Sequence, residues 1–125
     1  MANLNERHRI LEGMVDCTDC HDQHGKSTRA SLGGVKQEKC FQCHTDKEGP
    51  FVYEHGSIRV EGCTTCHNPH GNVNRHMLAY QQTADLCFSC HAEVPSFHTR
   101  FQATTNCTNC HTEIHGSNLS PFFLR

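Results

Sequence analysis

The sequence lacks most of what a conventional hydrophobic core requires. It has no tryptophan, and only 35% of its 125 residues are hydrophobic even when its ten cysteines are counted among them. A domain of this length normally fills its interior with aliphatic and aromatic side chains. We therefore expect a non-protein group to supply much of the apolar interior.

Long runs of one character are also missing. No stretch approaches the roughly 20 apolar residues that a membrane-spanning helix needs, so no transmembrane segment is expected. The first residues have no apolar signal-peptide region, and we expect any export signal to lie outside this sequence. The net charge is −2 and no basic block is present, which excludes nucleic acid from the expected partners.

Cysteine and histidine, by contrast, are abundant, with ten and twelve residues. The cysteines form five pairs, each with two residues between its members and a histidine directly after the second. The pairs are Cys17 with Cys20, Cys40 with Cys43, Cys63 with Cys66, Cys87 with Cys90, and Cys107 with Cys110, and the histidines that follow are His21, His44, His67, His91 and His111. C-x-x-C-H attaches c-type haem: two thiols bond to the porphyrin, and the imidazole binds the iron. The sequence predicts five haem c groups.

Paired cysteines have two other interpretations. A lone C-x-x-C occurs in zinc and redox sites, and disulfide frameworks are common in exported, cysteine-rich chains. Neither requires a histidine after every second cysteine. Five matches out of five therefore favour haem over zinc or disulfides.

The five motifs are arranged as an internal repeat. First cysteines of the odd-numbered sites are 46 and 44 residues apart, and those of the even-numbered sites are 47 apart. Each odd-numbered site has a histidine eight or nine residues before it and a His-Gly pair three or four residues after its proximal histidine. We predict one pentahaem domain, residues 1–125, made of two and a half copies of a two-haem unit of about 46 residues.

Breaker residues recur along the chain, as in Gly33-Gly34, Gly49-Pro50 and Asn68-Pro69. They predict a mostly irregular fold with short α-helices around the C-x-x-C-H sites and little or no sheet. Helices are expected near residues 78–90 and 100–110. The stacked haems are expected to form the core, as in a multihaem cytochrome c.

Seven histidines remain as ligands for the far side of the five irons. Six lie at repeat-equivalent positions: His8, His55 and His98 before the odd-numbered sites, and His24, His70 and His115 in the His-Gly pairs. His76 lies outside the pattern and is not expected to be a ligand. Met14 and Met77 are the internal sulfur alternatives, which abundant histidine makes the minority choice.

A topological argument assigns these distal histidines. One that precedes a motif by eight or nine residues can fold back over that motif's haem, whereas one just after the proximal ligand points away from its own iron. The expected distal ligands are His8 for the first haem, His70 for the second, His55 for the third, His115 for the fourth and His98 for the fifth. His24 is left over as a spare residue, an alternative to His8, or a ligand to a haem on another chain.

Two axial imidazoles leave no position on an iron for a substrate. Five closely packed haems of this kind predict electron transfer and no enzyme activity. The alternative, a reductase of nitrite or hydroxylamine, needs a haem without its distal histidine. Expected partners are redox proteins, chiefly other cytochromes, in a homo-polymer or a larger complex. Because covalent haem is attached outside the cytoplasm, we expect a periplasmic, cell-surface or extracellular location.

Three segments carry a family resemblance: Gly49–His55 (G-P-F-V-Y-E-H), Cys63–Gly71 (C-T-T-C-H-N-P-H-G) and Cys107–Asn118 (C-T-N-C-H-T-E-I-H-G-S-N). They resemble the C-terminal half of the MtrA/DmsE-type periplasmic decahaem cytochromes. The resemblance covers about His8 to Arg125. It implies bis-histidine haems in a staggered wire, a periplasmic or outer-membrane location, and a respiratory or extracellular electron path. With five haems instead of ten, a shuttle, a subunit of a complex or a repeating unit of an assembly is expected.

Overall fold

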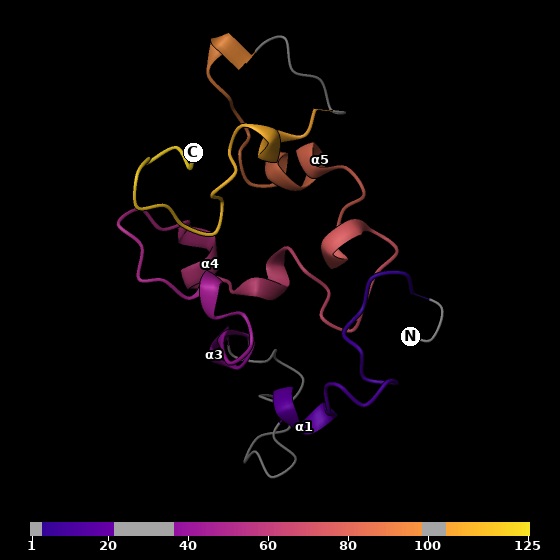
Figure 1. The fold of residues 1–125 in the computed structure, drawn as a ribbon. Coiled ribbons are helices and arrows are strands. Elements are labelled where there is room, and N and C mark those ends of the chain that lie inside the picture. The colour runs from indigo at the N-terminus through magenta and orange to yellow at the C-terminus, as the bar shows by residue number, and fades with distance from the viewer. Residues whose placement is uncertain (1–3, 22–36, 99–104) are drawn as a thin grey trace.

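The computed structural model describes residues 4–21, 37–98 and 105–125 (Figure 1). Its helices are all short. The α-helices are α1 (Cys17–Cys20), α3 (Gln37–Phe41), α4 (Gly56–Val60) and α5 (Thr83–Phe88). The 3₁₀ helices are η1 (Thr45–Lys47), η2 (Cys63–Thr65), η3 (Arg75–Met77), η4 (Ser96–His98) and η5 (Cys107–Asn109). Helices overlap all five C-x-x-C-H sites, as expected.

Each C-x-x-C-H motif forms a single helical turn. In all five, the histidine amide donates to the carbonyl of the first cysteine, with N···O distances of 2.8–3.0 Å. Residues three apart share one face of such a turn. The turn therefore places both thiols of a motif on one side, and the histidine at its end.

The structure confirms the mostly irregular fold without a sheet. Within the described residues, strand pairing is limited to three isolated antiparallel bridges: Glu6 with Asn72, Tyr53 with Ser117, and His67 with Leu78. The helix expected near residues 78–90 is reduced to α5. Its first residues are extended instead, because Leu78 pairs with His67 and the Ala79 amide donates to the Cys66 carbonyl at 2.8 Å. Of the helix expected near 100–110, residues 99–104 lie outside the described ranges.

Few residues are buried by protein alone. In the described part of the chain these are Gly71, Ala84, Gly116 and Ser117, and no large side chain there is fully buried. Three of the four lie beside two of the backbone bridges. The polypeptide is thus packed most closely at these bridges.

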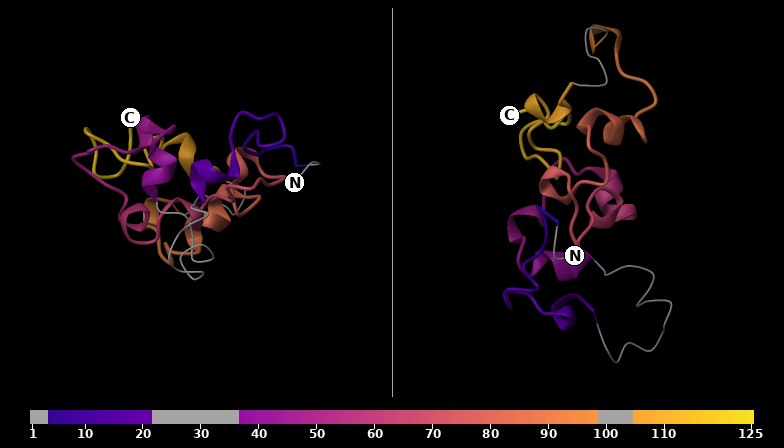
Figure 2. Two further views of the ribbon diagram at one scale, coloured as in Figure 1. Left: turned by 90° about the horizontal axis from the view of Figure 1, so that it is seen from below. Right: turned by 90° about the vertical axis from the view of Figure 1, so that its right-hand side faces the viewer.

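The molecule is elongated in the views of Figures 1 and 2, with α1 near one end and η4 near the other. The first and second sites lie next to each other in space, since α1 contacts α3, and so do the fourth and fifth, since α5 contacts η5. No helix in ranges 4–21, 37–98 and 105–125 is long and apolar enough to cross a membrane.

Candidate haem sites

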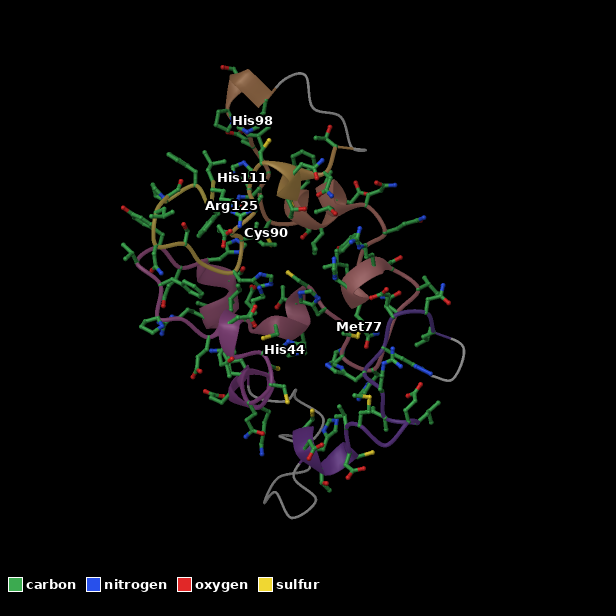
Figure 3. The ribbon with its side chains drawn as sticks, in the orientation of Figure 1. His44, Met77, Cys90, His98, His111 and Arg125 are labelled. Atoms are coloured by element: carbon green, nitrogen blue, oxygen red, sulfur yellow. The ribbon has the colours of Figure 1, made fainter. Side chains whose placement is uncertain are left out.

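Every histidine that follows a cysteine pair lies opposite the ring of a second histidine. The pairs are His21 with His70, His44 with His8, His67 with His115, His91 with His55, and His111 with His98. Figure 3 labels both residues of the last pair, His98 and His111, near the end of the molecule away from His44. The structure thus brings together all five proximal histidines and five of the six repeat-equivalent histidines.

The spacing within these pairs suits a shared metal ion. Ring centroids are 6.2 Å apart in four pairs and 5.8 Å apart between His21 and His70. Two imidazole nitrogens about 2.0 Å from one metal ion would place the ring centroids roughly 6 Å apart. Four pairs have nearly parallel rings, 13–28° apart, and His8 and His44 meet at 67°. Each pair therefore has room for one iron between its rings.

The facing rings differ from the partners expected from chain distance. His8 faces His44 of the second site, not His21 of the first, and His55 faces His91 of the fourth site, not His67 of the third. His70 and His115 lie at the first and third sites, whereas the second and fourth were expected. Only His98 lies opposite the expected partner, His111.

The observed ring pairs differ from the expected ones because of two long-range backbone contacts. The chain before His8 runs antiparallel to the chain after His70, and the chain before His55 runs antiparallel to the chain after His115. Each bridge carries the earlier histidine away from the motif that follows it. The folding-back argument considered only loop length and had no information on these partners.

Hydrogen bonds orient two distal rings. The Nδ1 of His8 is 2.6 Å from the carbonyl oxygen of Pro69, the residue before His70. The His55 ring likewise bonds to the backbone of Ile114, the residue before His115. A carbonyl oxygen can only accept, so Nδ1 of His8 carries a proton, and Nε2 is the ring nitrogen left to bind a metal ion. This is the state in which histidine binds a metal.

Two proximal rings are held in the same way. Nδ1 of His67 donates to the carbonyl oxygen of His76 at 2.8 Å, and Nδ1 of His111 donates to that of Phe122 at 2.5 Å. Both acceptors lie in turns with left-handed backbone: φ is 57° at His76 and at Phe123. These hydrogen bonds restrict the rotation of the two proximal imidazoles and leave their Nε2 atoms for a metal ion.

Burial favours the neutral form of two distal rings. It lowers the pKa of His55, and the neighbouring His91 lowers it further, against the opposing hydrogen bond to Ile114. The pKa of His115 is also lowered, first by burial and then by Lys47. A neutral imidazole has the lone pair that iron requires.

The cysteine thiols run in chain order from site to site. Burial, followed by the neighbouring Cys63 thiol, raises the pKa of Cys40 to about 11. In the same way burial and Cys107 raise the pKa of Cys87 to about 11. Both thiols hydrogen-bond to that neighbour. Each of these two thiols therefore lies beside a thiol of a neighbouring motif.

Exposure divides the ten candidate thiols into two groups. Six are partly buried, whereas four are exposed: Cys17, Cys43, Cys90 and Cys110. Cys43 also lies outside the helix of its motif, because α3 ends at Phe41 and Cys43 follows in the turn that leads to His44. These four thiols stay exposed because the polypeptide has too few large apolar side chains to cover them by itself.

The remaining candidates have different positions. His24 lies outside the described residues. Met14 is strongly exposed, with 72% of its surface accessible, whereas Met77 lies in the η3 turn (Figure 3). His76 contributes a backbone carbonyl to the His67 ring. In the described residues, no three His, Cys, Asp or Glu side chains cluster as a metal-ion site would require.

Sequence reasoning missed the backbone groups that orient the rings. The carbonyls of Pro69, His76, Ile114 and Phe122 have no sequence signature, because any residue type supplies a carbonyl. It also missed the function of the glycine in each His-Gly pair. Gly71 and Gly116 have φ of +117° and +152°, and a side chain there would collide with the opposing chain. A glycine directly after a candidate ligand could have indicated that another backbone segment lies close to that position.

These residues fit covalently attached haem. Thiols on one face of a turn, a proximal imidazole and a second imidazole facing it are the donor set of a c-type haem with two histidine ligands. Five such sets in one chain define a multihaem c-type cytochrome, a class of protein that carries electrons on haem.

Comparison with known proteins agrees. Residues 8–49 and 55–95 match the family described as "Doubled CXXCH motif", and the chain belongs to that family. It is also 36% identical, over 94% of its length, to the multiheme cytochrome MtrA of Shewanella baltica (strain OS185). The chain spans 40% of the length of that relative. Both matched segments begin at a histidine, His8 or His55, that faces the proximal ring of its even-numbered site.

Proposed function

We propose that this protein conducts electrons through five covalently bound haems held in chain order, each iron bound by two histidines. The observation that carries the proposal is the set of five histidine ring pairs spaced for one iron each. When bound, haem supplies the reversible one-electron chemistry. The protein supplies its attachment, the orientation of its ligands and the exclusion of other ligands.

The order of the path follows from contacts between neighbouring sites. At the first junction, Cys20 lies close enough to both Cys40 and Cys43 for their charges to raise its pKa, after the larger effect of burial. At the second, the thiol of Cys40 forms a hydrogen bond with the thiol of Cys63. The first three sites therefore follow one another in space in the order of the sequence.

The later sites continue the same series. Cys66 lies beside Cys90, and the thiol of Cys87 forms a hydrogen bond with that of Cys107. Haems on these cysteines form a linear series from the first site to the fifth. In this series the haems themselves fill the interior that the described side chains leave unfilled, and they cover exposed thiols such as Cys43.

The ring pairs favour conduction over catalysis. All five proximal histidines face a second imidazole, so both axial positions of each iron are used. Nitrite or hydroxylamine reduction would need a displaced imidazole. Similarity to a protein named a multiheme cytochrome supports the same function for this chain.

Charge indicates the kind of partner. The net charge is −2, each haem adds two propionates, and each ferric bis-histidine core carries about +1, which gives roughly −7 in total. We propose a redox partner with a basic docking surface, such as another cytochrome. We place the protein outside the cytoplasm, in the periplasm or at the cell surface, where it acts alone or in a larger assembly.

The test combines haem inventory with ligand access. Intact mass should show five haems, and the ferric EPR spectrum should be entirely low-spin. The ferrous protein should bind no carbon monoxide, and nitrite and hydroxylamine should not be consumed. A stoichiometric high-spin haem that binds carbon monoxide and turns over nitrite would overturn the proposal in favour of a reductase.

A further inference from the structure

The two bridges beside the buried glycines are built to the same plan. In clasp 1 (residues 6–8 against 70–72), the amide of Glu6 donates to the carbonyl of Asn72 at 3.2 Å, and the amide of Asn72 to that of Glu6 at 2.8 Å. In clasp 2 (residues 53–55 against 115–117), Tyr53 and Ser117 exchange the same two bonds at 2.8 and 2.9 Å. In each clasp the bridge residue of the first segment comes two residues before a candidate distal ligand. The bridge residue of the second segment comes two residues after another.

Each clasp joins ligands of two different haems. Clasp 1 holds His8, which faces the second site, and His70, which faces the first. Clasp 2 holds His55, which faces the fourth site, and His115, which faces the third. Within each clasp the earlier histidine also bonds to the residue just before the later one. The two distal ligands of a unit thus share one hydrogen-bonded segment.

A glycine lets the two chains of each clasp approach. A Cβ on Gly71 would lie 2.8 Å from the Cβ of Arg7 and 2.9 Å from the Glu6 carbonyl oxygen. A Cβ on Gly116 would overlap the ring of Phe51. Both glycines are buried and have positive φ. Gly62 also has positive φ, +86°, yet a Cβ there would meet nothing within 4 Å.

From these contacts we infer that Gly71 and Gly116 are positioning residues, and that each clasp holds or releases the distal ligands of both haems of its unit together. Clasp 1 holds the distal ligands of the first and second haems, and clasp 2 holds those of the third and fourth. The fifth haem, whose ring pair His98–His111 lies outside both clasps, is independent. The inference rests on the proposed bis-histidine coordination and adds the coupling between sites.

The test compares Gly116→Ala, His115→Ala and Gly62→Ala by intact mass and quantitative EPR of the ferric proteins. All three should keep five covalent haems, because no cysteine is changed. Gly116→Ala should turn two of five haems high-spin, His115→Ala one, and Gly62→Ala none. If Gly116→Ala releases one haem or none, the clasp inference is overturned.

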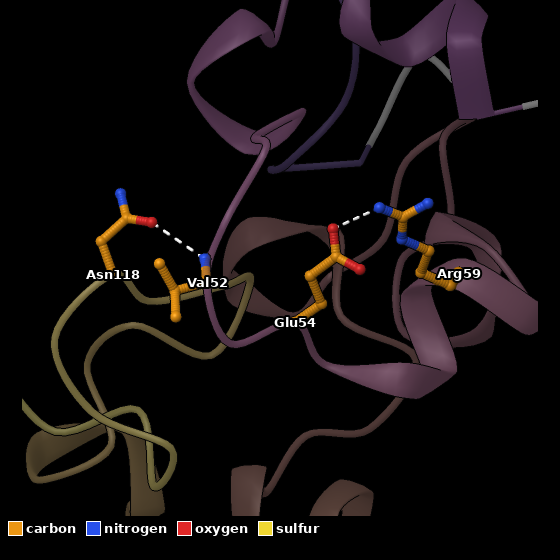
Figure 4. A network of polar contacts seen from close by, with 4 residues as sticks. All are labelled: Val52, Glu54, Arg59 and Asn118. Carbon is orange, nitrogen blue, oxygen red and sulfur yellow. Dashed lines mark hydrogen bonds and ion pairs between the residues drawn. The ribbon is translucent and has the colours of Figure 1, made fainter.

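Failure of the proposed function has a different signature, since the unchanged protein would then lack five low-spin haems. Should Gly116→Ala not assemble, Asn118→Ala tests the same point. It removes the side-chain amide group whose oxygen accepts from the Val52 backbone amide at 3.0 Å (Figure 4). During denaturant titration followed by EPR, the third and fourth haems should lose their distal ligands in one shared transition at lower denaturant. Separate transitions for these two haems would contradict the inference.

Discussion

In the first four sites the two facing histidines are 36 to 49 residues apart along the chain, whereas in the fifth they are 13 apart. These sequence separations agree closely between the two repeat units. The facing histidines are 36 residues apart in both even-numbered sites, and 49 and 48 residues apart in the first and third sites. Closing a 49-residue loop costs about 1 kcal/mol more entropy than closing a 13-residue loop. The clasps supply hydrogen bonds that offset this cost.

The difference shows two ways to provide a second imidazole. In the clasped sites it comes from a distant segment that also serves the neighbouring site. In the fifth site it comes from η4, shortly before the cysteine pair. The first arrangement ties neighbouring sites together, and the second leaves its site self-contained. The following changes test that contrast, from the largest expected effect to the smallest.

Removal of whole sites should separate the two arrangements most strongly. Cys107→Ala with Cys110→Ala should leave four low-spin haems and an uninterrupted path among them. Cys63→Ala with Cys66→Ala should also leave four haems, but with a gap in the middle of the series. Stopped-flow reduction should be slower and biphasic only in the second variant. Equal kinetics in both would contradict a linear path.

Loss of a single distal ligand should open a different haem in each arrangement. His8→Ala should make the second haem high-spin, because His8 faces His44. His98→Ala should do the same to the fifth haem. Hyperfine-shifted NMR signals assign the affected haem in each case. A high-spin first haem in His8→Ala would restore the assignment expected from chain distance.

Close approach in clasp 1 can be measured as stability. Gly71→Ala and Gly13→Ala both place an alanine at positive φ, which costs about 1–2 kcal/mol. Only at Gly71 would the new methyl meet the opposing chain, adding about 1–3 kcal/mol. Denaturant unfolding should therefore rank Gly71→Ala as clearly less stable. Equal stability of the two variants would show that the chains are not in contact there.

The smallest effect concerns the polar contacts around clasp 2 (Figure 4). Asn118→Ala should lower the free energy of unfolding by about 1 kcal/mol, since the Val52 amide loses its acceptor. Arg59→Ala breaks an exposed ion pair with Glu54 and should have no measurable effect, because water screens such pairs. Thermal melts of both variants at low and high salt provide the comparison.

Local features were predictable from the sequence. The C-x-x-C-H turns depend on one i to i−4 hydrogen bond each, so the helix positions and proximal histidines follow from the motif. The absence of a sheet from the described residues follows from closely spaced breakers such as Gly49-Pro50 and Asn68-Pro69. His98 faces the ring expected from chain distance, that of His111, and it is also supplied locally.

Long-range features were not predictable in the same way. Whether His8 faces His21 or His44 depends on the bridge between Glu6 and Asn72, which are 66 residues apart. That bridge consists of backbone hydrogen bonds, which any residue type can make. The His-Gly pairs indicated where two backbone segments approach closely. A single sequence does not indicate which segment packs against each glycine.

An experimental structure of the haem-loaded protein tests the central claim most directly, because it shows which histidine binds which iron. We predict that the first to fifth haems, in chain order, have His70, His8, His115, His55 and His98 as distal ligands. The same structure should show Cys43, exposed in the polypeptide alone, covered by the second haem. Coordination of the first haem by His8 and the third by His55 would contradict the exchange of ligands between neighbouring sites, and with it the clasps.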